Sequence, residues 1–245
     1  LSQTVGGLLP LIFFLRKTNG SKLHIVRTRL ELRPVLQACS NGASELITNI
    51  SSSVVSMLYN HQLLTLAGEN GVSAYGVLMY VSFIFAAVYI GYSIGTAPIV
   101  GYNYGAQNHE ELRNIRVKSM RSMLIGGVIM VSLAELLAPV LAGIFVGYDK
   151  ELFDMTVHAF RLFSFTFLLS GFNIWCSSFF TALNNGAISA AVSFLRTLVF
   201  QLAAVLILPI FFKLDGVWFS VAFAEVCAFI ISVIFLIAKR KKYNY

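Results

Sequence analysis

Six long segments of this chain carry at most two charged residues each and mix Ala, Leu, Ile and Phe without a two-residue alternation. They cover about residues 34–58, 74–100, 120–145, 155–181, 187–212 and 217–238. A helix needs about 20 apolar residues to cross a bilayer, so each segment is long enough to span one. Only 12% of the 245 residues are charged, whereas about a quarter is usual in soluble domains. The sequence therefore predicts an all-α fold, a polytopic transmembrane helical bundle with six membrane-spanning helices.

The first 33 residues divide into two parts. Residues 8–15 are apolar but too short to cross a bilayer, and no signal-peptide pattern accompanies them. We therefore expect residues 1–15 to be the end of a preceding transmembrane helix, in a fragment of a longer protein. Residues 16–33 are rich in Lys and Arg and are predicted to form a basic loop. Residues 34–245 are predicted to form a six-helix transmembrane lobe.

The basic residues are distributed unevenly among the connections. Of the 18 Lys and Arg residues, 14 fall in 16–33, 113–121 and 239–242, which lie on the same side of the predicted bundle. The positive-inside rule places these segments, and with them the C-terminal tail, in the cytoplasm. The net charge of +7 then reflects membrane topology. A nucleic-acid partner is not expected, because no soluble domain displays the basic residues.

Motifs for catalysis or metal binding are not found. Asn108 and Glu111 have the spacing of a helix-capping box, so a helix is expected to begin just after Asn108. His109 and Glu110 begin a zinc-protease pattern, but Arg113 stands where its second histidine belongs. The cysteines have no ligand-like spacing either. We therefore expect neither an enzyme nor a metal, and no cofactor beyond a coupling ion.

Polar side chains recur at helical spacing within three of the six segments. The stripes are Gln37, Asn41, Glu45, Asn49 and Ser53 in the first segment, Tyr75, Ser82, Tyr89, Thr96 and Asn103 in the second, and Thr166, Ser170, Asn173, Ser177 and Thr181 in the fourth. Such residues can simply hold helices together. Three long stripes are better explained by a water-filled pathway, because polar groups are costly in lipid.

Three ionisable residues lie near the predicted mid-plane of the membrane: Glu45, Arg196 and Glu225. Arg196 and Glu225 share a depth and are predicted to pair, as an architectural contact or in a coupling role. Glu45 has no cationic partner on its stripe, which suits reversible protonation or attraction of a cationic substrate, although a hydrogen-bonded packing role is the alternative. Tyr75 and Tyr89 offer aromatic faces for an organic cation.

Four stretches of the sequence are distinctive: PIVGYNYGAQN at 98–108, LAGENGVSAYG at 66–76, FTALNNG at 180–186 and DGVW at 215–218. They resemble the C-terminal half of a multidrug and toxic compound extrusion (MATE) transporter, most closely the bacterial DinF-like or MepA-like branch. The first is the most specific, with Pro98, Gly101, Asn103 and Gly105 as its family-motif residues. The resemblance as a whole covers nearly the whole chain.

The resemblance implies a twelve-helix antiporter of two six-helix lobes in the bacterial cell membrane, with this chain supplying helices 7 to 12 and the N-terminal lobe as its missing partner. It implies export of organic, cationic compounds by alternating access, driven by H⁺ or Na⁺, through a cavity lined in this lobe by helices 7, 8 and 10. The predicted cavity residues are Glu45, Asn41, Asn49, Gln37, Tyr75, Tyr89, Asn173 and Ser177. In NorM-like members, a helix 7 glutamate and a helix 10 aspartate contribute to a cation site. Helix 10 of this chain offers Asn173 in place of an acid.

Two other readings stay open. A lipid-linked oligosaccharide flippase of the same superfamily favours a strongly basic cavity, and these polar stripes contain no Lys or Arg. A membrane scaffold without transport activity does not need three wet helical faces. The partners expected under the main reading are the lipid bilayer and a small organic substrate.

Overall fold

The computed structural model describes residues 4, 6–8, 11–12, 31–243 and 245, with all their side chains except those of Ser40, Asn41, Ser44 and Glu45. The chain divides into two compact units, Leu1–Gln37 and Ala38–Tyr245. In the first unit, residues 6–8 and 11–12 are helical and exposed. The predictions for residues 1–15 and 16–33 fall largely outside the described residues.

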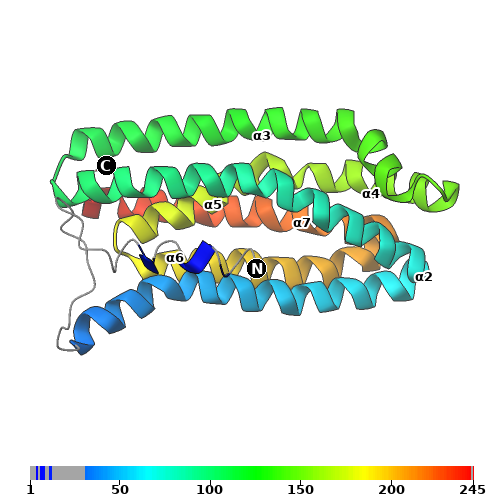
Figure 1. The fold of residues 1–245 in the computed structure, drawn as a ribbon, viewed down its shortest axis with the longest axis horizontal. Helices are drawn as coiled ribbons and strands as arrows, with labels where there is room; N and C mark the ends of the chain where they lie inside the picture. The colour runs from blue at the N-terminus through cyan, green and yellow to red at the C-terminus, as the bar shows by residue number, and fades with distance from the viewer. Residues whose placement is uncertain (1–3, 5, 9–10, 13–30, 244) are drawn as a thin grey trace. The chain divides into compact units, whose positions relative to one another are not determined.

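Helices make up almost all of the described chain, as expected for an all-α protein, and none of the described residues lies in a strand. The helices are α2 (Leu32–Gly105), α3 (His109–Val146), α4 (Lys150–Ser164), α5 (Thr166–Ala182), α6 (Gly186–Phe194), the π-helix η1 (Leu195–Phe200) and α7 (Gln201–Tyr243). In the second unit, α5 packs against α3, α6 and α7, while α4 packs against α3 and α7 (Figure 1). This arrangement places α5 at the centre of the lobe.

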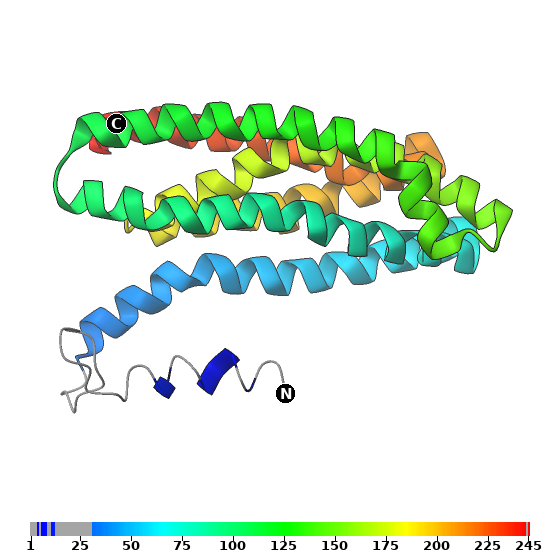
Figure 2. The same cartoon turned by 45° about the horizontal axis from the view of Figure 1, so that its top comes forward.

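Two of the helices fold back on themselves. The backbone of α2 leaves helical geometry at Gly68 (φ 62°), and that of α7 does so at Lys213 (φ 51°). A positive φ is easily adopted by glycine but strained for lysine. At the second bend the returning chain comes so close that a Cβ on Gly216 would lie 2.5 Å from the Leu208 carbonyl oxygen. Figure 2 shows the two arms of α2, which the bend at Gly68 separates.

The helices of the structure do not correspond one to one with the six predicted spans. Among the described residues, three helical stretches are long and apolar enough to cross a bilayer: Leu46–Gly105, His109–Val146 and Gly186–Tyr243. A bent pair, α4 and α5, gives a fourth candidate. These helices make the chain a multi-pass membrane protein, and the count of six stays a prediction.

The span predicted at 155–181 is not one straight helix. α4 and α5 meet at a bend of 46° beside Phe165. Ser164 precedes the bend, and its hydroxyl donates to the Glu135 carboxylate and to the Arg161 carbonyl. A hydroxyl group that bonds to a preceding carbonyl of its own helix favours bending. The composition of the segment alone did not predict this bend.

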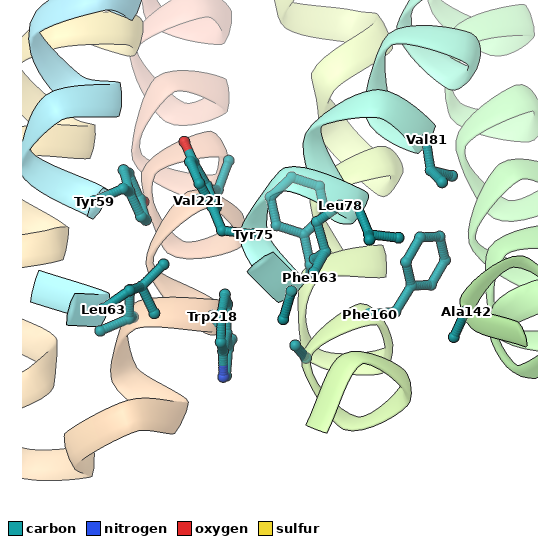
Figure 3. Packing of buried hydrophobic residues seen from close by; sticks show 14 of the residues in the cluster. Tyr59, Leu63, Tyr75, Leu78, Val81, Ala142, Phe160, Phe163, Trp218 and Val221 are labelled. Atoms are coloured by element: carbon teal, nitrogen blue, oxygen red, sulfur yellow. The ribbon is translucent and has the colours of Figure 1, made fainter. Parts of the chain in front are cut away.

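Aromatic side chains fill the core of the lobe. Tyr59 and Tyr75, from the two arms of α2, stack with ring centroids 5.3 Å apart. Figure 3 shows them near Trp218 of α7, in a cluster that extends to Phe160 of α4. The Tyr59 hydroxyl also bonds to that of Ser220 on α7. Large buried rings therefore bridge α2 to the rest of the lobe.

The start of α3 and the end of α7 close the side of the lobe that is predicted to face the cytoplasm. Asn108 caps α3 by accepting from the Glu111 N–H at 3.2 Å, which confirms the predicted helix start. Tyr245 is buried, and its ring lies 5.1 Å from the Arg116 guanidinium and 5.2 Å from Phe179. Burial raises the pKa of the Tyr245 phenol, which therefore stays a neutral donor to the Leu236 carbonyl at 3.1 Å.

Candidate functional site

A buried ion pair lies between η1 and α7. The Arg196 guanidinium donates from Nε to both carboxylate oxygens of Glu225, at 2.9 and 3.1 Å, and its terminal nitrogen lies 2.8 Å from Oε1. Asn173 of α5 adds a third element, because its Nδ2 donates to Glu225 Oε2 at 2.7 Å and to the Glu225 carbonyl at 3.0 Å. The pair predicted from depth thus forms, joined by an amide from the central helix.

The two charged side chains differ in how deeply they are buried in the lobe. The Glu225 side chain is 2% exposed and that of Arg196 is 17% exposed. Removing charges from water costs several kcal/mol per ion, in order of magnitude, and good geometry offsets that cost. The several donors around one carboxylate supply such geometry. The buried carboxylate of Glu225 is therefore fully engaged by donors from Arg196 and Asn173.

Local structure sets the position of each group. Arg196 lies in η1, a π-helical turn between α6 and α7. Single π-turns inside helices occur often at functional sites. Arg196 is the second residue of this turn, and its guanidinium contacts Glu225 of α7.

A cluster of hydroxyl groups lies between α5 and α6. The Ser177 hydroxyl is 2.8 Å from that of Ser189 and 3.0 Å from that of Ser193, and Thr181 donates to the Ser189 hydroxyl at 2.7 Å. Ser189 is fully buried. Ser177 follows Asn173 by one turn of α5, so the hydroxyl cluster and the ion pair share one side of that helix.

The fifth predicted segment carries none of the three predicted polar stripes, yet it supplies part of this polar seam. Ser189, Ser193 and Thr197 recur every four residues, a spacing that places them on one helical face. That spacing was the sequence signal for a polar face, but it was not recognised because the surrounding residues are apolar.

The other predicted cavity residues are distributed over several environments. Tyr75 and Tyr89 are 6% and 1% exposed and lie in the core of the lobe. The Tyr89 hydroxyl donates to the Phe167 carbonyl at 2.8 Å. Asn49 is exposed on α2. Thus the structure does not gather these three residues around one pocket.

The remaining three predicted residues lie near the start of α2. Gln37 is exposed and belongs to the first unit. Asn41 and Glu45 lie on α2, but their side chains are outside the described ones. The predicted roles of Asn41 and Glu45 therefore stay predictions.

The motif at 98–108 forms the end of α2 and the turn that follows. Pro98 is exposed inside the helix, and Asn103 donates from Nδ2 to the Ile99 carbonyl at 2.9 Å. A Cβ on Gly101 would come 3.7 Å from the Ala182 carbonyl oxygen of α5. Gly105 ends the helix. In this lobe the motif shapes a helix end close to α5.

A pocket of about 540 Å³ lies at the Gly68 bend of α2. It is lined by Asn60, His61, Leu64, Glu69, Val72 and Ser73. The buried ion pair does not line it. Within the described part of the chain, no group of three His, Cys, Asp or Glu residues is arranged to hold a metal ion.

Solved structures similar to this chain include MATE transporters. An outward-facing multidrug resistance MATE family transporter of the MOP superfamily matches with a TM-score of 0.88 and 20% identity, covering 99% of this chain and 55% of that one. An inward-facing conformation of such a transporter gives 0.75 and 19%, covering 96% and 54%. A MOP superfamily transporter from Pyrococcus furiosus gives 0.87 and 21%, covering 98% and 55%.

The chain therefore spans about half the length of these solved structures, as expected for one lobe. At such identities the likeness concerns the fold. A comparison with curated proteins found none that matches. The model of the MatE family matches residues 45–207, which is more than half of the chain. The chain belongs to the MatE family, whose members are transporters rather than enzymes.

Proposed function

We propose that this chain is the C-terminal half of a cation-coupled exporter of organic cations, driven by H⁺ or Na⁺, in the bacterial cell membrane. The observation that carries the proposal is a seam of buried polar and charged groups in an otherwise apolar helical lobe of the MatE family. Such groups are costly in lipid and mark ion or substrate pathways. An inert scaffold does not need them.

Alternating access is the mechanism proposed. In transporters built from repeated lobes, the two lobes rock around a central site, and binding of the ion shifts the balance between outward-open and inward-open states. The first arm of α2 supports a role in such a site. Asn49 and Ser53 of its polar stripe, and the adjacent Ser52, are exposed in this lobe. A second lobe or a water-filled cavity between the lobes would cover them.

Export from energised everted vesicles tests the proposal. The full-length protein is supplied with a fluorescent organic cation, and proton and sodium gradients are imposed separately. Wild type is compared with Glu45→Gln, which removes the charge predicted at mid-membrane. Glu151→Gln is the matched control, because Glu151 is exposed in the first turn of α4.

The proposal expects export that depends on one of the two gradients, that is lost in Glu45→Gln and that is retained in Glu151→Gln at equal membrane abundance. Equal export by all three proteins would remove Glu45 from the site and move coupling to the other lobe. Absence of export for every organic cation tested would contradict the proposal and favour a flippase, which transport of a lipid-linked oligosaccharide would then test.

A further inference from the structure

Only the nitrogen of the Asn173 side-chain amide forms hydrogen bonds with the described residues. Its Nδ2 group donates twice to Glu225, whereas its Oδ1 is buried without a hydrogen-bond donor among the described residues. Buried polar atoms are usually paired. An amide that turns over presents an oxygen in place of its nitrogen. Asn173 can therefore serve Glu225 in two states, donating to the carboxylate or accepting from the O–H of the protonated acid.

Arg196 and Glu225 are not equally free to separate. Arg196 is 17% exposed, while Glu225 is 2% exposed, so part of the guanidinium reaches the surface of this lobe and the carboxylate does not. Arg196 also lies in the only π-helical turn of the described chain. Once Arg196 withdraws, a buried carboxylate without a cation is strongly disfavoured, and binding a proton removes that cost.

Hydroxyl groups lead from one end of the lobe toward this acid. Thr181, in the last turn of α5, donates to Ser189, and Ser189 contacts Ser177 at 2.8 Å. Ser177 lies one turn from Asn173 on α5. Hydroxyls both donate and accept, so each can receive a proton on one side and release one on the other. The chain of hydroxyls begins at the end that is predicted to face the cytoplasm.

We infer that Glu225 is a proton-binding site of this lobe, reached from the α5–α6 end through the hydroxyls of Thr181, Ser189 and Ser177. A proton from solvent water enters the chain of hydroxyls, and one proton reaches the carboxylate and forms a neutral carboxylic acid. Arg196 keeps its charge and turns away, and the Asn173 oxygen accepts from the new O–H. The inference rests on the proposed function for its link to export, but proton binding itself does not require export.

Few other charges bear on this acid. Among the described residues, Arg196 is the charged group that contacts the Glu225 carboxylate. On the helices that pack around it, the nearest titratable groups along the sequence are the thiols of Cys176 on α5 and Cys227 on α7. Neither carries a hydrogen bond to Glu225, since the Cys176 thiol donates to the Ser232 carbonyl.

Infrared difference spectroscopy of the full-length protein in detergent tests the inference. Spectra in acidic and alkaline buffer are compared for wild type and Glu225→Gln, and the rise of the carboxylic-acid carbonyl band is timed after a pH jump. Ser177→Ala interrupts the chain of hydroxyls. Ser178→Ala is its matched control, because the Ser178 hydroxyl donates instead to the Ser93 carbonyl.

The expected result is a component of the carboxylic-acid carbonyl band that is present in wild type and absent in Glu225→Gln. Its rise slows about tenfold in Ser177→Ala, equivalent to about 1.4 kcal/mol on the barrier, and is unchanged in Ser178→Ala. A carbonyl band that Glu225→Gln leaves unchanged would overturn the inference and leave the pair purely architectural. If Glu225→Gln does not fold, equal rates in the two serine variants would overturn it. A Glu225 band without gradient-driven export would instead contradict only the proposed function.

Discussion

The first arm of α2 and the central helix α5 carry similar polar stripes but use them differently. On α2, the Ser52 and Ser53 hydroxyls donate back to carbonyls of their own helix at 2.8 and 3.2 Å, and both residues are exposed. On α5, Ser177 contacts hydroxyls of α6, and Asn173 bonds to α7. One stripe remains on the surface of this lobe, while the other is part of its interior.

The difference shows what a polar stripe in a membrane helix means. Periodicity identifies the face that avoids lipid, but it does not say whether protein, water or a second lobe covers that face. The structure separates the two cases through burial and hydrogen-bond partners. Changes on α5 and its neighbours should therefore affect stability, whereas changes on the first arm of α2 should affect transport with little loss of stability.

The largest expected effect comes from breaking the buried ion pair. Arg196→Met leaves Glu225 buried without its cation, which should destabilise the full-length protein by about 3–5 kcal/mol. Thermal unfolding in detergent measures the loss, with the exposed Arg113→Met as control. Adding Glu225→Met should restore much of the stability. Equal unfolding temperatures for the Arg196 and Arg113 variants would contradict the assignment.

A single methyl group should disturb the contact between α3 and α5. A Cβ on Gly127 would lie 2.2 Å from the Leu168 carbonyl oxygen, whereas on the adjacent Gly126 the nearest atom would be 3.9 Å away. We expect Gly127→Ala to cost about 1–3 kcal/mol, as overpacking usually does, and Gly126→Ala to be tolerated. Unfolding of both variants checks this, and a well-tolerated Gly127→Ala would mean that the two helices pack less closely.

A smaller effect is expected where α2 does reach the interior. Tyr59→Phe removes the hydroxyl that bonds to Ser220 and should cost about 1 kcal/mol. Tyr80→Phe is the control, because Tyr80 is 70% exposed. If both substitutions lower the unfolding temperature equally, the bond to Ser220 does not contribute to stability.

The smallest effect on stability should come from the exposed stripe itself. Ser53→Ala removes an exposed hydroxyl that bonds only to its own helix among the contacts described, so its cost should stay within about 0.5 kcal/mol. Ser177→Ala should cost more, because it disrupts contacts with two hydroxyls of α6. A reversed order in parallel unfolding experiments would remove the distinction between the two stripes.

The sequence predicted much of this fold, because apolar length and helix-capping chemistry are local properties. The start of α3 after Asn108 followed from one capping pattern. The reversals at Gly68 and Lys213 fall in the connections between predicted spans. The break beside Phe165 was not predicted, because it lies inside one continuous apolar segment.

The candidate site was only partly predictable. Equal depth placed Arg196 opposite Glu225, since depth follows from counting residues along a helix. The part played by Asn173 depends on which face of α5 meets α7, and that is a tertiary property. Tyr75 and Tyr89 lie in the core instead of beside a pocket because large rings also fill the space between helices.

Export by the full-length protein, with Glu45→Gln and Glu225→Gln in parallel, tests the central claim most directly. The initial rate of organic-cation export from everted vesicles is measured under a proton gradient or a sodium gradient alone. The account predicts export that requires one of these gradients, is lost in Glu45→Gln and, if protons are the coupling ion, is reduced in Glu225→Gln. Export that proceeds at the same rate without either gradient would contradict it.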